Sequence, residues 1–182
     1  MQSRNQLDKN YSYWFSLRDA NQKESDYEDA IKYLCTFSTV EEFWQIYSHL
    51  KKPDALPVNS EYHVFQEGIK PMWEDEANRN GARWILRIKK GAASAFWEEL
   101  LLCMIGEQFD VTNEICGIAV SVRTVEDIFS VWVRSGQDQS VKQSVKETLK
   151  KIWALNESVV LEYKEHPHIQ QKPPPKNSRF GH

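Results

Sequence analysis

Two neighbouring stretches decide the fold: Gly117-Ile118-Ala119-Val120-Ser121-Val122-Arg123 and Ile128-Phe129-Ser130-Val131-Trp132-Val133. In each stretch, apolar side chains recur at every second position, which predicts β-strands with one buried face. A short acidic turn joins them, so the two strands are predicted to form an antiparallel hairpin. Its apolar face carries Ile118, Val120, Val122, Phe129, Val131 and Val133. Its other face carries Ser121, Arg123, Ile128, Ser130 and Trp132.

Outward from this hairpin, similar patterns predict further strands at residues 11–17, 27–37, 61–65, 83–89 and 159–163. The clearest of them is 83–89, because strand side chains point to opposite faces in turn. Its apolar face holds Trp84, Leu86 and Ile88, and its basic face holds Arg83, Arg87 and Lys89.

Three amphipathic helices are predicted between the strands. Ser38-Thr39-Val40-Glu41 has the spacing of a capping box and begins a helix that runs to about residue 50. A second helix covers residues 94–105 and ends at Gly106, and a third covers 141–155. At about 100° per residue, Trp44 falls beside the apolar arc of the first helix and Leu102 falls on the outer face of the second. Both side chains are therefore expected to be exposed.

One-sided strands and one-sided helices together predict an α+β fold, an antiparallel sheet with three helices packed on one face. The opposite face of the sheet is then left for a ligand. We expect one domain over residues 10–166, a flexible segment over 1–9 and a flexible Pro-rich tail over 167–182.

Composition excludes several classes of function. The net charge of −3 argues against charge-driven coating of nucleic acid, which needs a basic face. Three cysteines at no metal-ligand spacing predict neither a disulfide framework nor a zinc site and favour a reducing compartment. No apolar run approaches the roughly 20 residues of a membrane span, and the polar start is not typical of a signal peptide. We therefore expect a protein of the cytoplasm or nucleus, with no cofactor and no membrane partner.

The segment Lys70-Pro71-Met72-Trp73-Glu74-Asp75-Glu76 is the clearest candidate for ligand binding. An indole beside a hydrogen-bond acceptor suits a flat, cationic ligand with N–H donors on one edge. Arg83, Arg123 and Trp132 lie on the predicted open face, and loops can bring in Tyr27 and Trp73 with Glu74. This set fits a purine base carrying phosphates.

Plainer interpretations remain open for single residues. A loop tryptophan such as Trp73 is about as often a packing lid as a ligand platform. Arg83 and Arg123 alone would be solvated or paired strand residues. An enzyme that uses Glu74, Asp75 and Glu76 for acid–base chemistry is disfavoured, because adjacent residues do not face each other across a scissile bond.

Taken in order, the motifs resemble the messenger RNA cap-binding translation initiation factor 4E family. The resemblance covers about residues 7–166 and rests on Thr36-Phe37-Ser38-Thr39-Val40-Glu41-Glu42-Phe43-Trp44, Gly68-Ile69-Lys70-Pro71-Met72-Trp73-Glu74-Asp75, Gly81-Ala82-Arg83-Trp84, Cys103-Met104-Ile105-Gly106-Glu107-Gln108-Phe109 and Ile115-Cys116-Gly117. Details such as Glu162-Tyr163-Lys164 look like the 4E-homologous protein branch, a class tied to repression of translation.

The resemblance implies a cupped antiparallel sheet with three helices on its convex face and a 7-methylguanosine cap on the concave face. Tyr27 and Trp73 would sandwich the methylated base, with a cation–π contribution. Glu74 would accept the base N–H groups, and the Trp73 backbone N–H would donate to O6. Trp132 would pack against the methyl group, and Arg123 with Arg83 would bind the phosphates.

The resemblance also implies a partner-binding surface on the helices. It would receive a helix that carries a tyrosine, four residues, then leucine and a hydrophobic residue, as in helix-in-groove recognition. The matching residues are Val40, Trp44, Glu99, Leu102 and Gly106.

Departures from the family pattern shape the expected function. Tyr27 stands where the general factor has tryptophan, Val125 and Ile128 stand where it has phosphate-binding lysines, and Glu98 replaces an apolar residue on the helix face. These changes imply weaker cap affinity. Together with the resemblance to the 4E-homologous branch, they lead us to expect a monomeric cap-binding protein that represses initiation by recruiting partners. The alternatives are an interaction adaptor with a vestigial pocket and a general factor that supports initiation.

Overall fold

The computed structural model describes residues 4–18 and 27–167, and within them the chain forms one antiparallel sheet with helices on one face. The sheet has seven strands in the order β2-β1-β3-β5-β6-β4-β7. The strands are β1 (Gln6–Leu17), β2 (Ile31–Thr39), β3 (Ser60–Gln66), β4 (Ala82–Lys89), β5 (Ile115–Val122), β6 (Glu126–Val133) and β7 (Leu161–Glu165). The helices are α1 (Tyr27–Ala30), α2 (Val40–His49), α3 (Ala93–Ile105) and α4 (Gln139–Ile152), with short 3-10 turns η2 (Pro53–Ala55) and η3 (Thr112–Glu114).

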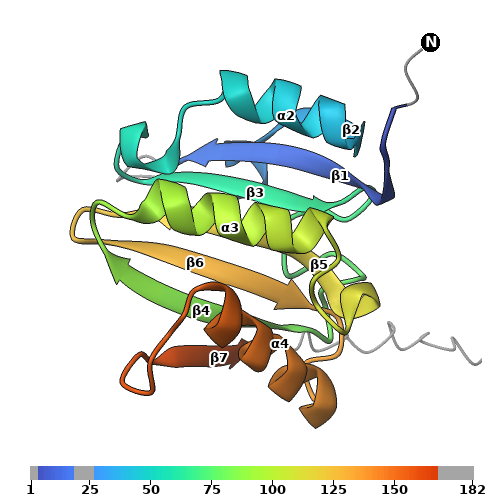
Figure 1. The fold of residues 1–182 in the computed structure, drawn as a ribbon, viewed down its shortest axis with the longest axis vertical. Helices are drawn as coiled ribbons and strands as arrows, with labels where there is room; N and C mark the ends of the chain where they lie inside the picture. Colours follow the sequence, from blue (N-terminus) through green and yellow to red (C-terminus); the bar gives the residue numbers. More distant parts are fainter. Residues whose placement is uncertain (1–3, 19–26, 168–182) are drawn as a thin grey trace, which may run out of the picture.

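The predicted fold class is correct. Helices α2, α3 and α4 lie across the same face of the curved sheet, with α3 over its centre (Figure 1). The short helix α1, which comes just before β2, was not predicted. No helix in the described part of the chain is long and apolar enough to span a membrane.

The hairpin of β5 and β6 has the predicted faces. Ile118 pairs with Val131 and Val120 with Phe129, and all four side chains are at most 1% exposed. They form the floor of the core beneath α3, whose Trp97 is fully buried. Because side chains alternate along a strand, the same pairing directs Ser121, Ser130 and Trp132 to the opposite, helix-free face.

Helix α2 begins one residue later than the capping box predicted. Thr39, not Ser38, is the N-cap, and its Oγ1 accepts a hydrogen bond from the Glu42 backbone N–H at 3.1 Å. The Glu42 carboxylate in turn accepts from the Ser38 N–H at 2.9 Å. Thr39 is still extended and pairs with Gln6, so strand β2 continues to the cap itself.

The end of α3 also differs from the prediction in detail. Gly106 is the C-cap, but its φ of −89° is one that any residue adopts, and it is Glu107 that has the left-handed φ of 53°. The N–H groups of Glu107 and Gln108 bond back to the carbonyls of Met104 and Cys103, which closes the helix as a Schellman motif.

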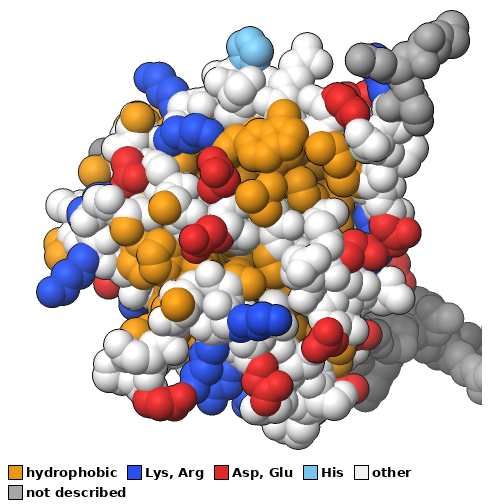
Figure 2. Space-filling view, in the orientation of Figure 1, with side chains coloured by type: hydrophobic (Ala, Val, Ile, Leu, Met, Phe, Trp, Pro, Cys, Tyr) orange, Lys and Arg blue, Asp and Glu red, His pale blue; other side chains and the backbone are white. Residues whose placement is uncertain are grey.

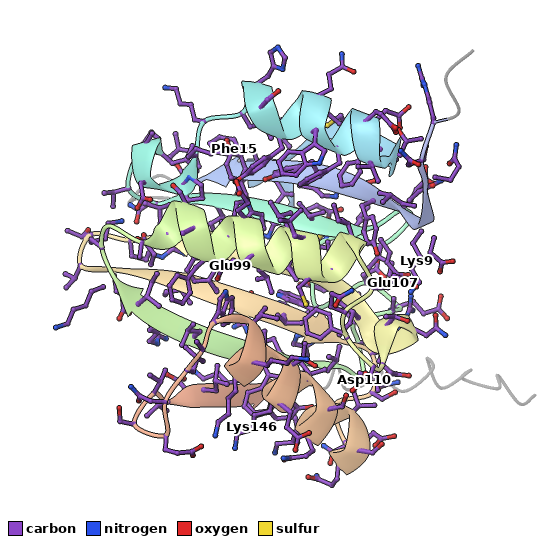
Figure 3. The ribbon with its side chains drawn as sticks, viewed as in Figure 1. Lys9, Phe15, Glu99, Glu107, Asp110 and Lys146 are labelled. Atoms are coloured by element: carbon purple, nitrogen blue, oxygen red, sulfur yellow. The ribbon has the colours of Figure 1, made fainter. Side chains whose placement is uncertain are left out.

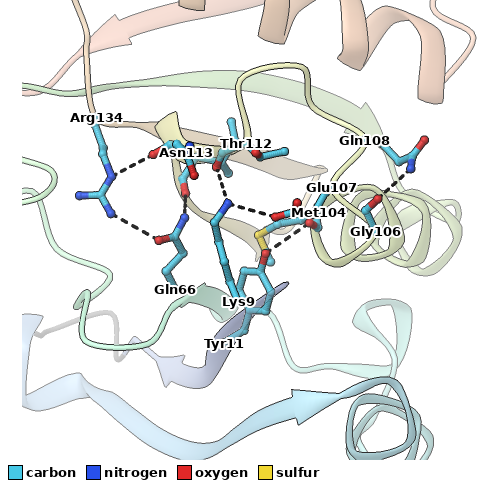
Figure 4. Close-up of polar contacts among 11 residues, drawn as sticks. Lys9, Tyr11, Gln66, Met104, Gly106, Glu107, Gln108, Thr112, Asn113 and Arg134 are labelled. Carbon is cyan, nitrogen blue, oxygen red and sulfur yellow. Dashed lines mark hydrogen bonds and ion pairs between the residues drawn. The ribbon is translucent and has the colours of Figure 1, made fainter. Parts of the chain in front are cut away.

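Part of the expected flexible segment over residues 1–9 is strand, because β1 begins at Gln6. The Lys9 ammonium donates to the Glu107 carboxylate and to the Thr112 carbonyl, both at 3.1 Å, so the start of β1 is tied to the end of α3 (Figure 4). Farther along the chain, the Pro-rich tail beyond residue 167 lies outside the described residues.

Candidate functional site

A hollow of about 230 Å³ lies on the helix-free face of the sheet. Five strands from β3 to β7 and the end of β1 contribute to it. Its lining residues are Arg18, Glu61, His63, Arg83, Ile85, Arg87, Ala119, Ser121, Arg123, Ile128, Ser130, Trp132 and Lys164. The predicted site residues Arg83, Arg123 and Trp132 are therefore brought together here, as strand alternation indicated.

Trp132 is held from several sides although it lines the hollow. Its ring meets Phe65 edge-on at a centroid distance of 5.4 Å and lies 4.5 Å from the ring of His166. The Arg83 Cζ lies 5.6 Å from the Trp132 ring centroid, and the indole N–H donates to the Ser130 Oγ at 3.2 Å. The indole is therefore held in a fixed orientation and is only 4% exposed, although it is one of the residues that line the hollow.

His166, which sequence reasoning missed, follows β7 directly and is buried. Burial lowers the pKa of its imidazole below the ordinary value, against the opposing effect of a hydrogen bond to the Asn78 carbonyl. The neutral ring can donate from Nδ1 to that carbonyl, at 2.7 Å. His166 thereby connects Trp132 to the loop that carries Trp73.

Trp73 and Glu74 lie in that loop, beside the hollow and not among its lining residues. Trp73 is half-buried and packs against a small cluster formed by Phe65, Ile69, Cys116 and Trp132. The backbone carbonyl of Glu74 accepts a hydrogen bond from Nη2 of Arg79 at 3.3 Å. Glu74 is exposed, so the residue is accessible to solvent on the surface of the loop.

The loop itself is fixed by an internal amide. The Asn78 Nδ2 donates to the carbonyls of Lys70 and Met72, at 3.0 and 2.7 Å. The Asp75 carboxylate accepts from the Lys70 backbone N–H at 3.0 Å. These bonds replace regular secondary structure and hold Trp73 in place.

The side chain of Tyr27 lies outside the described part of the structure, so its predicted stacking role stays a prediction. Its backbone begins helix α1. The next residue, Glu28, forms an ion pair with Lys70 at 3.0 Å. Helix α1 therefore lies next to the Trp73 loop.

A buried carboxylate lies among the cations of the hollow. Glu61 is 3% exposed and accepts a hydrogen bond from Nη2 of Arg123. The Arg18 Nε lies 3.7 Å from one of its oxygens and the His63 Nε2 lies 3.4 Å from the other. Burial alone would raise the pKa of the Glu61 carboxyl. His63 and the guanidinium groups of Arg18 and Arg123 lower this pKa by a larger amount, so it lies well below its ordinary value.

Two more lining cations are paired with carboxylates at the sheet edge. Arg87 contacts Glu126 at 2.6 Å and Glu162 at 3.2 Å, and Lys164 contacts Glu162 at 3.3 Å. Alternation in 83–89 had placed Arg87 on the same face as Arg83, a signal that could have identified it. Alternation with Tyr62 and Val64 likewise places Glu61 and His63 on this face of the sheet, although it gives no sign that they are buried.

The helix face presents an apolar surface where the predicted partner site lies. We call Val40, Trp44, Glu99, Leu102 and Gly106 the dorsal surface. Trp44 is 42% and Leu102 38% exposed, as predicted from the helical wheel. Figure 2 shows hydrophobic side chains at the surface over α2 and toward α3, and Figure 3 shows Glu99 on α3. Val40 is half-buried at the start of α2, while Glu99 and Gly106 are exposed.

Comparison with known proteins agrees with this architecture. The model of the Eukaryotic initiation factor 4E family matches residues 6–180. A rice protein, eukaryotic translation initiation factor NCBP of Oryza sativa subsp. japonica, is 42% identical over 160 residues, which cover 88% of this chain and 70% of that protein.

Two solved structures are similar over nearly the whole chain. The complex of C. elegans eIF4E-3 with the 4E-binding protein Mextli and cap analog has a TM-score of 0.85 and 35% identity, covering 90% of this chain and 94% of that chain. Ascaris suum eIF4E-3 in complex with m7G cap has a TM-score of 0.85 and 34% identity, covering 94% and 97%. By its family model, its relatives and its fold, the chain belongs to the eukaryotic initiation factor 4E family.

Proposed function

We propose that the chain binds the 7-methylguanosine 5′ cap of messenger RNA at the hollow and the adjoining Trp73 loop. The observation that carries the proposal is the cluster shared by Trp73 and Trp132 beside a hollow lined by cations. The similar solved chains are described as complexes with cap or cap analog, which supports the same ligand here.

In this proposal the aromatic residues of the site bind the base of the ligand, and the basic residues bind its phosphates. Trp73, with Tyr27 opposite, stacks on the methylated base, whose positive charge strengthens stacking on an indole. The exposed Glu74 carboxylate accepts the base N–H groups. Trp132 contacts the methyl group, and Arg83 with Arg123 contacts the phosphates.

A fluorescence titration tests cap binding, because ligand stacking quenches tryptophan emission. We expect 7-methyl-GTP to bind and plain GTP to bind much more weakly. Glu74→Ala should lower the affinity for 7-methyl-GTP by at least ten-fold, since a charged hydrogen bond is worth about 1.5–3 kcal/mol. Glu76→Ala, which removes an exposed carboxylate from the same loop, is the matched control. Undiminished binding by Glu74→Ala would refute the assignment.

We further propose that the protein represses translation initiation, as a cytoplasmic monomer that recruits a partner through the dorsal surface. Val125 is 81% exposed at the hairpin turn and Ile128 lines the hollow. Neither side chain can attract phosphate, so cap affinity is expected to be modest. A cap-bound protein of this kind would block the 5′ end most effectively with a partner attached.

Cell-free translation of a capped reporter tests repression. Added protein should lower the yield from the capped reporter and leave an uncapped reporter unchanged. Trp44→Ala should bind the cap normally and lose repression that depends on a partner. A rise in capped translation on addition of the wild-type protein would favour a general initiation factor instead.

The second candidate function is a protein-interaction adaptor, in which cap binding at the hollow contributes little to activity. The pairing of Arg123 with Glu61 favours it, because a cation already neutralised attracts phosphate less. Under this alternative, Trp73→Ala would keep full activity and Trp44→Ala would abolish it. Loss of activity in both variants would support cap-dependent repression.

A further inference from the structure

We propose that Glu61 acts as an internal counter-ion of the hollow and sets how much the phosphate chain of a cap adds to affinity. The proposal rests on the cap-binding function proposed above and assigns to Glu61 a positioning role that acts through Arg123.

The geometry shows that Glu61 is committed to the cations of the hollow. Its side chain is 4% exposed, and both of its oxygens face nitrogen atoms, those of Arg123 and Arg18 on one side and that of His63 on the other. Arg123 is also restrained by its own strand, because Nη1 donates to the Val122 carbonyl at 3.3 Å. The guanidinium is thus oriented by two acceptors before any ligand arrives.

The other charged residues of the hollow show that Glu61 is the main source of negative charge within it. Arg87 and Lys164 are balanced by Glu126 and Glu162, which are not lining residues. Among the described residues that line the hollow, Glu61 is the one carboxylate.

A phosphate group that approaches Arg123 must therefore share the guanidinium with Glu61 and is repelled by the buried charge of Glu61. The repulsion grows with the number of phosphates, and both effects are absent for the nucleoside. Glu61 consequently lowers the affinity gained from each added phosphate while it keeps Arg123 aimed at the hollow.

The test compares 7-methylguanosine, its monophosphate and its triphosphate on wild type and Glu61→Gln by tryptophan quenching. Glutamine keeps an acceptor for Arg123, and its amide can face His63, but it removes the charge. We expect the ratio of triphosphate to nucleoside affinity to rise about ten-fold in Glu61→Gln, with nucleoside affinity within two-fold of wild type. Glu147→Gln on α4, an equal charge change on the helix face, should leave the ratio unchanged.

A second charge-removing variant, Glu61→Ala, is expected to raise the same ratio, and Glu61→Asp, which keeps the charge, to hold it near the wild-type value. Thermal unfolding of each variant identifies any that fails to fold. An unchanged or reduced ratio in a folded Gln or Ala variant would overturn the proposal while wild-type cap binding stands. Absence of binding by wild type to every methylated ligand would overturn the proposed function, and this inference with it.

Discussion

Gly117 is the position where a single methyl group should disturb both the fold and the site. It lies in β5 opposite Phe65 of β3 and opposite Trp132 of β6. A Cβ at this position would lie 2.3 Å from the Cγ and 2.4 Å from the Cδ2 of the Phe65 ring. Real Cβ atoms do not approach ring carbons so closely, so Gly117→Ala must displace the Phe65 ring or the strand.

The expected cost follows from overpacking a dense core. Phe65 is fully buried, and forcing a methyl group into such a site costs about 1–3 kcal/mol. With a urea dependence of about 2 kcal/mol per molar, a loss of ~2 kcal/mol shifts the unfolding midpoint by about 1 M. Because the Phe65 ring packs against the Trp132 ring, the affinity for 7-methyl-GTP should fall as well.

Urea unfolding measured in two backgrounds checks the cause. If the collision with the ring is responsible, Gly117→Ala should cost less than about 0.5 kcal/mol in a Phe65→Ala protein, where the ring is missing. A Gly117→Ala protein with wild-type stability would refute the steric argument. An equal cost in both backgrounds would refute it too, because the loss would then have to come from the backbone of the bulge at Cys116 and not from packing.

Three further predictions follow from features of the helices and the thiols. Trp44→Ala should weaken binding of a peptide with a Tyr-x4-Leu-hydrophobic motif by at least ten-fold in fluorescence polarisation, because a large aromatic residue at an interface is typical of a hot spot. The affinity for 7-methyl-GTP should be unchanged. Equal peptide binding by the variant and the wild type would exclude Trp44 from the interface. Thr39→Ala should lower the free energy of unfolding by about 1 kcal/mol in urea titrations, since the N-cap bond to the first turn of α2 is lost. Burial raises the pKa of the Cys103 and Cys116 thiols to about 12. Near neutral pH a disulfide reagent should therefore modify them far more slowly than it modifies the half-buried Cys35. Rapid modification of all three thiols would show that the core opens.

Much of this molecule was predictable because the period of strands is two. Alternation alone placed Arg83, Arg123 and Trp132 on one face, and the helical wheel alone turned Trp44 and Leu102 outward. Both inferences need only local geometry, which the backbone of each element fixes.

The buried polar residues of the site were not predictable in the same way. A glutamate in a strand is read as solvent-facing, and Glu61 is buried because Arg18 and Arg123, far away in the sequence, supply its partners. The same limit applies to element ends. Thr39, the cap of α2, pairs with Gln6, and Glu107 in the turn after α3 is bonded to Lys9, contacts that no local pattern reveals.

The two faces of strand β6 differ in how they tolerate substitution. Phe129 and Val131 are packed under the helices, whereas Ile128, Ser130 and Trp132 line the hollow. Substitutions at one set of alternate positions can therefore alter ligand affinity in small steps while the other set keeps the sheet folded. A single exchange such as lysine for isoleucine at position 128 would therefore add positive charge to the hollow and leave the packed face of β6 unchanged.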